Sequence, residues 1–109
     1  MAYDEGLAER VRSLIEERGG GKEKKMFGGL AFMVRGHMCF GVVGDELMIR
    51  VGPDAYEAAL REHGAREMDF TGRPLRGMVF VGNDELTEDE ALAAWLDRGL
   101  AFVRTLPPR

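Results

Sequence analysis

Three observations predict a two-layer α+β fold in which helices cover one face of an antiparallel sheet. Between residues 22 and 51, apolar residues alternate with polar ones and glycine-containing turns separate the runs, which is typical of short antiparallel strands. Apolar residues recur at helical spacing in three other segments. One apolar face of the sheet would give these helices a surface to pack on. The predicted order is α-β-β-β-β-α-β-α, with three helices and about five strands in one domain spanning residues 1–109.

The N-terminal segment, residues 4–18, is predicted to be an amphipathic helix. Asp4 is placed to cap it, and the glycines at 19–21 end it. Its apolar stripe consists of Leu7, Val11, Leu14 and Ile15. A first strand then runs from Lys22 to Phe27, and the paired glycines at 28–29 turn the chain into the second strand.

The hairpin at Gly44-Asp45 is the clearest local signal in the chain. Glycine at the first central position suits a two-residue II′ turn. This register pairs Val42 with Leu47, Phe40 with Ile49 and Met38 with Val51.

The hairpin at Arg35-Gly36 has two alternatives. A two-residue I′ turn requires a positive φ at Arg35, which costs ~1–2 kcal/mol for a residue with a Cβ atom. A type I turn followed by Gly36 in a G1 bulge avoids that cost, so we favour it. The bulge places Leu30 and Phe32 on one face with Met38 and Phe40. The opposite, mixed face then carries Ala31, Met33, His37, Cys39, Gly41, Val43, Glu46, Met48 and Arg50.

The second half of the sequence supplies the remaining cover. A short helix over residues 55–63 follows Pro53 and a capping Asp54, and its inner side carries Tyr56, Ala59, Leu60 and His63. Residues 65–74 are expected to form a loop pinned by Phe70, and residues 75–81 a fifth strand. Thr87 and Glu90 predict a capping box for the last helix. The stripe of that helix consists of Leu92, Trp95, Leu96, Gly99, Phe102, Val103 and Leu106.

Composition limits the class of protein. With 45% hydrophobic and 31% charged residues the chain is globular, and no apolar run reaches the ~20 residues that cross a bilayer. No signal peptide is visible, and Cys39 is the only cysteine, so we expect a cytoplasmic protein without a membrane partner. A net charge of −4 argues against direct nucleic-acid binding. Lys22, Lys24 and Lys25 form the only basic run, typical of a solvated strand edge.

The residues available for catalysis are few. Ser13, His37 and His63 lie in no recognisable nucleophile or metal motif, so we expect no catalytic residues, no cofactor and no enzyme activity. His37 and Cys39 are two residues apart on one predicted strand face, and with Met33 or Met48 they suggest a soft-metal or small-molecule site as the alternative function. Two such ligands fall short of a tetrahedral set, which favours Cys39 as a small buried residue and His37 as a turn residue.

Residues 24–52 resemble the signature region of the TfoX/Sxy family N-terminal domain. The matching features are Lys25-Met26-Phe27-Gly28-Gly29, Gly36, Phe40-Gly41, Asp45-x-Leu47 and Arg50-Val51, followed by Phe70, Pro74, Gly77 and Trp95. The resemblance implies a two-layer α/β domain linked to bacterial regulators of competence genes. In that family the domain precedes a C-terminal one. Because the resemblance to the N-terminal domain already covers nearly the whole of these 109 residues, we expect a stand-alone N-terminal domain here. The family offers no established catalytic residues.

Together these patterns predict a non-enzymatic protein-interaction or regulatory domain, acting as a transcription accessory through protein contacts. The expected partner surface joins the mixed sheet face to the first strand edge. Its residues are Lys25, Met26, Phe27, Gly28, Gly29, Met33, Cys39, Met48 and Arg50. The sequence does not name the protein partner. Self-association into a homodimer, through this face or an exposed edge strand, is a further expectation.

Overall fold

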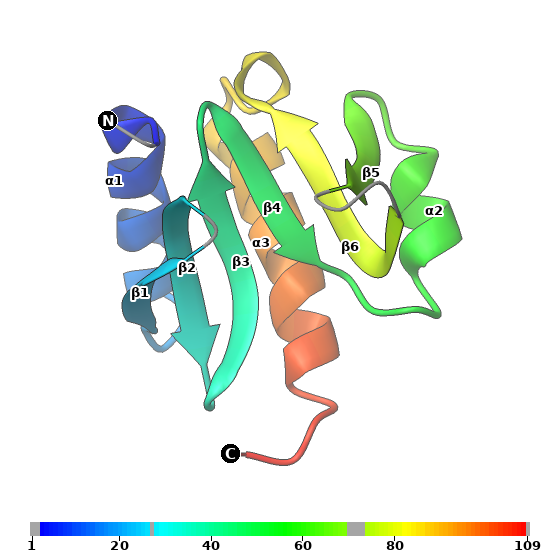
Figure 1. The fold of residues 1–109 in the computed structure, drawn as a ribbon. Coiled ribbons are helices and arrows are strands. Elements are labelled where there is room, and N and C mark those ends of the chain that lie inside the picture. The colour runs from blue at the N-terminus through cyan, green and yellow to red at the C-terminus, as the bar shows by residue number, and fades with distance from the viewer. Residues whose placement is uncertain (1–2, 27, 70–73, 109) are drawn as a thin grey trace.

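The structure is a computed structural model that describes residues 3–26, 28–69 and 74–108. Within these residues the chain forms a six-stranded sheet, three α-helices and one short 3-10 helix (Figure 1). Their order is α1 (Glu5–Glu16), β1 (Lys22–Met26), β2 (Gly29–Val34), β3 (His37–Val43), β4 (Glu46–Arg50), α2 (Tyr56–Leu60), β5 (Ala65–Asp69), β6 (Pro74–Gly82), η1 (Asn83–Glu85) and α3 (Asp89–Val103). The predicted α+β class and element order are confirmed, with one strand more than expected.

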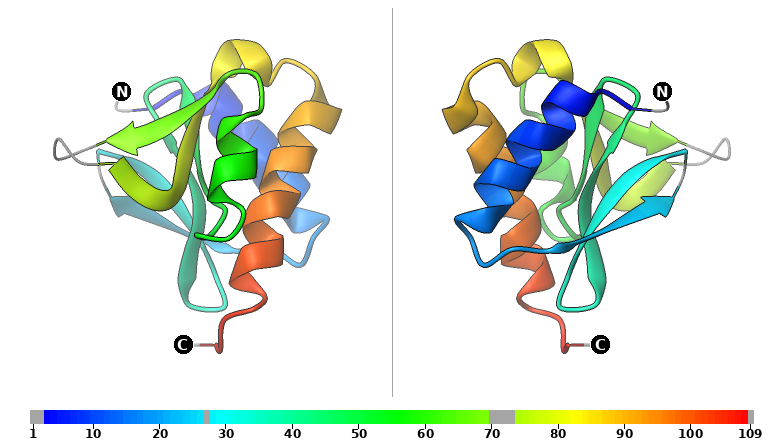
Figure 2. Two further views of the ribbon diagram at one scale, coloured as in Figure 1. Left: turned by 90° about the vertical axis from the view of Figure 1, so that its right-hand side faces the viewer. Right: turned by 90° about the vertical axis from the view of Figure 1, so that its left-hand side faces the viewer.

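All neighbouring strands of the sheet are antiparallel, in the order β1-β2-β3-β4-β6-β5. The helices gather on one side of this sheet, and the ends of β1 and β5 reach away from them (Figure 2). Because β1 and β5 stand at the two ends of the strand order, they are the edge strands of the sheet. No helix in the described ranges combines the length and apolar character that a membrane span requires.

One apolar cluster lies between the sheet and all three helices. The sheet contributes the six residues predicted for this face: Leu30, Phe32, Phe40, Val42, Leu47 and Ile49. The helices contribute Leu7, Ala8, Val11, Ile15, Tyr56, Ala59, Leu92, Trp95, Leu96, Leu100 and Val103. Phe32 and Phe40 are 1% and 0% exposed, with ring centroids 5.6 Å apart. This confirms the predicted packing of a helical layer on one sheet face.

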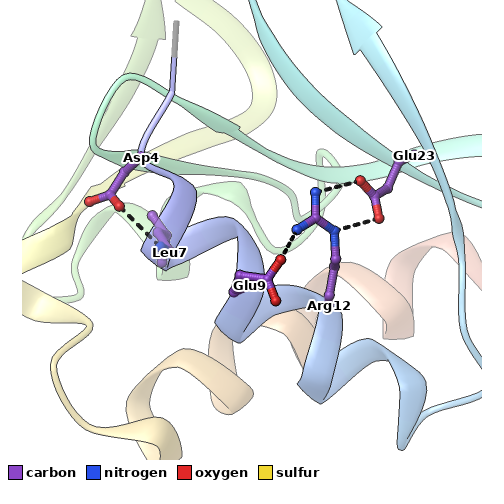
Figure 3. Close-up of polar contacts among 5 residues, drawn as sticks. All are labelled: Asp4, Leu7, Glu9, Arg12 and Glu23. Atoms are coloured by element: carbon purple, nitrogen blue, oxygen red, sulfur yellow. Dashed lines mark hydrogen bonds and ion pairs between the residues drawn. The ribbon is translucent and has the colours of Figure 1, made fainter. Parts of the chain in front are cut away.

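The helix caps agree with the sequence only at α1. The Asp4 carboxylate accepts a hydrogen bond of 3.2 Å from the backbone N–H of Leu7 (Figure 3). The capping box at α3 is wrong, because the helix begins later: Glu88 is its N-cap residue and makes no side-chain cap bond. At α2 the N-cap is Ala55, also without a side-chain bond, so the Asp54 cap is wrong too. His63 lies beyond α2 with its side chain 89% exposed, and not on the inner side of the helix.

The two hairpin predictions had different outcomes. Gly44 has φ 59°, and the β3–β4 register pairs Phe40 with Ile49 and Val42 with Leu47, as predicted. The expected Met38–Val51 pair is wrong, because the β3–β4 pairing ends at Phe40–Ile49 and β4 ends at Arg50.

At the first hairpin the type I turn with a G1 bulge is wrong. Arg35 and Gly36 have φ values of 56° and 84°, and Val34 pairs with His37, which is the two-residue I′ arrangement. The register does shift, but between Phe32 and Met33, so the extra residue is Cys39 on β3. Phe32 and Phe40 nevertheless share a face, as predicted, whereas Met38 lies on the opposite face from the one predicted.

The segment predicted as a loop over residues 65–74 contains the sixth strand. β5 pairs with β6 through Ala65–Val81, Arg66–Phe80 and Glu67–Val79. Ala65 packs against the main cluster, and the two residues that follow it, Arg66 and Glu67, are charged and exposed. A charged, single-sided edge strand has too weak an alternation to be recognised from sequence. The predicted role of Phe70 falls outside the described residues.

Candidate functional site

The sheet face turned away from the helices, called here the reverse face, was expected to carry the partner surface. Strand register assigns residues to it, because directly paired residues of antiparallel strands share a face. Met48 pairs with Gly41 and Phe80, opposite in alternation to Ile49, which lies in the helix-side cluster. Met33 pairs with Met38 on this same reverse face. On β1, Lys22 and Lys24 pair with Met33 and Ala31 and so lie on the reverse face as well.

Cys39 does not lie on the reverse face, which corrects the predicted surface. As the extra residue of the β3 bulge, it joins Phe40 in the helix-side cluster. Its thiol is 0% exposed, and Gly99 of α3 packs so closely that a Cβ there would lie 3.3 Å from the sulfur. Burial raises the pKa of Cys39 to about 12, so the thiolate is suppressed at neutral pH. Cys39 is a packed core residue and no partner contact.

His37 and the methionines do not come together as a soft-metal site. His37 is 8% exposed and its ring Nε2 lies 2.7 Å from the Pro107 carbonyl oxygen, beside the end of α3. Met33 and Met48 lie on the other face of the sheet. Within the described part of the chain no three side chains among His, Cys, Asp and Glu group closely enough to hold a metal ion. The arrangement of ligands that a soft-metal site at His37 and Cys39 would need is therefore not formed by these residues.

The reverse face has an apolar cluster of its own. Met48, Met78 and Phe80 are 1%, 8% and 5% exposed, and Met38 and Val43 pack against them while half-buried. The Met48 methyl group lies over Gly41, where a Cβ would be 3.0 Å away. Met48 was expected to be available to a partner, and its near-complete burial corrects that expectation. Met78 and Phe80 come from β6, which the sequence did not connect to this surface.

A charged pair lies over one end of the reverse-face cluster. The Arg66 guanidinium carbon lies 4.8 Å from the centroid of the Phe80 ring. Arg66 also pairs with Glu46, with an Nε–Oε2 distance of 3.0 Å. These contacts explain how Phe80 is covered without a second helical layer. Phe80 is consequently covered by the Arg66–Glu46 pair.

Arg50 pairs with Met78 and so belongs to the reverse face by register, but its guanidinium group reaches to the end of α3. Its guanidinium carbon lies 5.3 Å from the centroid of the Phe102 ring at the end of α3, and its Nη1 donates to the Met38 carbonyl oxygen over 3.4 Å. These contacts place the charge at the junction of β3, β4 and α3. The predicted face of Arg50 agrees with this register, and its role as a partner anchor stays a prediction.

The half of the reverse face nearest β1 remains accessible. We call this part the β1–β3 surface, and it consists of Lys22, Lys24, Met33, Met38 and Val43. The two lysines are exposed and the three apolar residues are half-buried. One row across the sheet runs Lys22–Met33–Met38, so a cationic edge borders an apolar floor. Strand alternation predicted Met38 on the covered face with Phe40. The bulge at Cys39 places it on the reverse face instead.

The two glycines of the MFGG segment shape the β1–β2 hairpin beside this surface. Gly28 has φ 72° in the β1–β2 turn, and a Cβ on Gly29 would overlap the Val42 carbonyl oxygen of β3. Both glycines are therefore required by the hairpin itself. Lys25 is exposed and pairs with Leu30, which places it on the helix side of the edge. Phe27 and the side chain of Met26 lie outside the described residues.

A charged contact ties β1 to α1. Arg12 donates to both carboxylate oxygens of Glu23, over 2.6 and 2.8 Å, and also contacts Glu9 (Figure 3). The hydrogen bonds from Arg12 lower the pKa of Glu23 below its ordinary value, against the opposing effect of partial burial. The one acidic side chain of the basic run, Glu23, is thus neutralised from within the molecule.

The fold and this surface together define a small two-layer α+β domain with a helical layer on one face and a methionine-rich reverse face. The chain belongs to the TfoX N-terminal domain family, whose model matches residues 13–103. It is therefore a competence-regulator-like domain, in agreement with the resemblance seen in residues 24–52. Comparisons with curated proteins and with solved structures found no match.

Proposed function

We propose that this domain acts without catalysis, as a cytoplasmic regulatory domain that works through protein contacts in the control of transcription. The observation that carries the proposal is the β1–β3 surface, where half-buried Met33, Met38 and Val43 border exposed lysines. An apolar centre with a polar rim is the usual anatomy of a protein interface, and methionine adapts its shape to a partner. Membership of a family named for a competence regulator supports the same reading.

The test is site-specific photo-crosslinking in the native cytoplasm. A photoreactive phenylalanine analogue replaces Met38 in one variant and Ala94, an exposed residue of α3, in the control. We expect a discrete crosslinked product from position 38 that Met33→Glu abolishes, while position 94 gives none. Equal crosslinking at both positions, or a product insensitive to Met33→Glu in a variant that folds normally, would overturn the proposal.

A second copy of the chain is one partner that the same experiment identifies. A crosslinked species of twice the chain mass, together with concentration-dependent sedimentation, would indicate a homodimer. A strict monomer over a wide concentration range would exclude it and leave a different protein as the partner.

A further inference from the structure

We propose that the free edge of β1 accepts an extended acidic segment of a partner protein as an added strand. The inference rests on the proposed function, because it names the chemistry of the partner. β1 is the first strand of the sheet and, among the strands that the structure describes, pairs only with β2. Its residues 22–25 are all exposed. The outer backbone N–H and C=O groups of such a strand form a template for another chain.

The charge of this edge is unbalanced. Lys22, Lys24 and Lys25 have no ion-pair partner among the described residues, whereas Glu23 is held by both nitrogens of the Arg12 fork. Because Arg12 and Glu23 cancel, the three lysines leave a local charge of +3 on a chain whose net charge is −4. They are also the only lysines in the sequence. The positive charge therefore marks one strand and no broad surface.

The arrangement selects an acidic strand over a second copy of β1. If two copies paired edge to edge with Lys22 opposite Lys24, Glu23 would also lie opposite Glu23, and like charges directly opposite destabilise a strand pair. A strand with carboxylates at alternate positions would place them beside Lys22 and Lys24 on the reverse face. Specificity then comes from both attraction and repulsion. A nucleic acid would meet the same charge, but it lacks the amide groups that pair with a strand edge.

The probe is a synthetic fluorescent peptide of alternating glutamate and threonine, titrated with the whole chain at low salt. We expect saturable binding, with NMR shift changes centred on the amides of β1. Lys22→Glu with Lys24→Glu should weaken binding about tenfold or more, because two attractive cross-strand pairs become repulsive. The matched control is Arg61→Glu with Arg104→Glu, which makes the same change in net charge at the exposed C-cap residues of α2 and α3 and should leave binding unchanged.

Backbone pairing is tested separately from charge. Peptides N-methylated at one alternate set of amides should lose binding, while methylation of the other set should leave it intact, since only one set faces β1. If both methylated peptides bind equally well, the added strand is wrong. If oligothymidine binds with shift changes on β1 and the peptide does not, the site is one for nucleic acid and the inference fails.

The outcome is independent of the crosslinking test. If position 38 still captures a partner while the peptide fails to bind, the proposed function stands and this inference alone is wrong. Because the lysines are exposed, the doubly substituted variant should fold. If its thermal melt differs from that of the natural chain, Lys22→Gln with Lys24→Gln replaces it.

Discussion

Arg35 illustrates how a local cost is accepted when the surrounding structure demands it. Its φ of 56° lies in the left-handed region, and it is the only residue other than glycine with a positive φ among those described. The turn is held on both sides by the Val34–His37 pair, and the Arg35 Nη1 donates to the Arg104 carbonyl at the end of α3 over 3.1 Å. Local strain of ~1–2 kcal/mol was the reason to expect a bulge there. Hairpin register outweighs that strain.

Arg35→Asn should therefore stabilise the protein by about 0.5–1 kcal/mol. Asparagine tolerates a positive φ, and Asn-Gly is the preferred I′ sequence, while the lost hydrogen bond is exposed and of little value. Urea unfolding of both proteins measures the change. A destabilised variant would mean that the contact with α3 contributes more than the backbone strain costs.

Gly29→Ala should destabilise the protein by about 2–3 kcal/mol, since an added Cβ overlaps the Val42 carbonyl oxygen and backbone atoms must move. Gly28→Ala is the matched control. No atom lies within 4 Å of a Cβ at Gly28, so the cost there is only the positive φ of 72°, about 1–2 kcal/mol. Thermal or urea unfolding should rank the two variants in this order. The reverse order would indicate that β2 and β3 are not in close contact at Gly29.

Among the elements, α1 and β1 are joined by charge as well as by apolar packing. Val11 and Ile15 of α1 face the core, while Arg12 bridges to Glu23 of β1 along the outside (Figure 3). β1 is an edge strand, so it has one strand neighbour instead of two. The Arg12–Glu23 contact gives it a second attachment.

The contribution of this contact should disappear in acid. A carboxylate whose pKa is lower in the folded protein adds stability above its unfolded pKa, and that stability is lost as the pH falls through the folded value. Arg12→Gln should reduce stability at neutral pH by at most about 1 kcal/mol, because the pair is partly exposed. Well below the ordinary glutamate pKa of about 4.3, the difference from the natural chain should vanish.

Urea unfolding at several pH values tests this, with Arg61→Gln at the exposed C-cap residue of α2 as the control. A difference between Arg12→Gln and the natural chain that persists unchanged in acid would show that Arg12 acts through packing and not through charge.

The whole molecule differs from the simple two-layer picture in having apolar clusters on both sides of one sheet. The helix-side cluster holds the larger set of buried residues, and Met48, Met78 and Phe80 form the smaller one behind the sheet. Phe40 lies at the centre of the larger cluster, opposite both Phe32 and Ile49. Any exposure of residues at this depth requires the helices to separate from the sheet.

Cys39 therefore reports on global unfolding. Because its thiol is fully buried and its pKa is raised to about 12, a thiol reagent should modify it only in molecules that have opened. Labelling should be slower than for the unfolded chain by roughly a thousandfold or more, given a typical stability of at least about 5 kcal/mol. The urea dependence of the labelling rate should match that of global unfolding. A rate that does not respond to low urea would reveal a local opening of β3.

Removal of the Phe40 ring should affect the molecule as a whole. Phe40→Ala is expected to cost about 3–5 kcal/mol, a large share of the stability of a small domain. Chemical denaturation measures the change in the free energy of unfolding, with Thr105→Ala at an exposed position as the control. Ala101→Gly is unsuitable as a control because it lowers helix propensity. A loss below about 1 kcal/mol would contradict the central position of this ring.

The sequence by itself determined the α+β class, the order of the predicted elements, the Gly44-Asp45 hairpin and the six residues of the covered sheet face. These depend on local periodicity and turn chemistry, which neighbouring residues encode. Tertiary structure alone decided the I′ turn at Arg35, the bulge at Cys39, the strand at Ala65–Asp69 and the partners of Arg50 and His37. The physical reason is that a one-residue shift in register moves a side chain to the other face of the sheet, and long-range pairing sets that register. Cys39 thus became a core residue, and the accessible surface moved to Met33 and Met38 beside the lysines of β1.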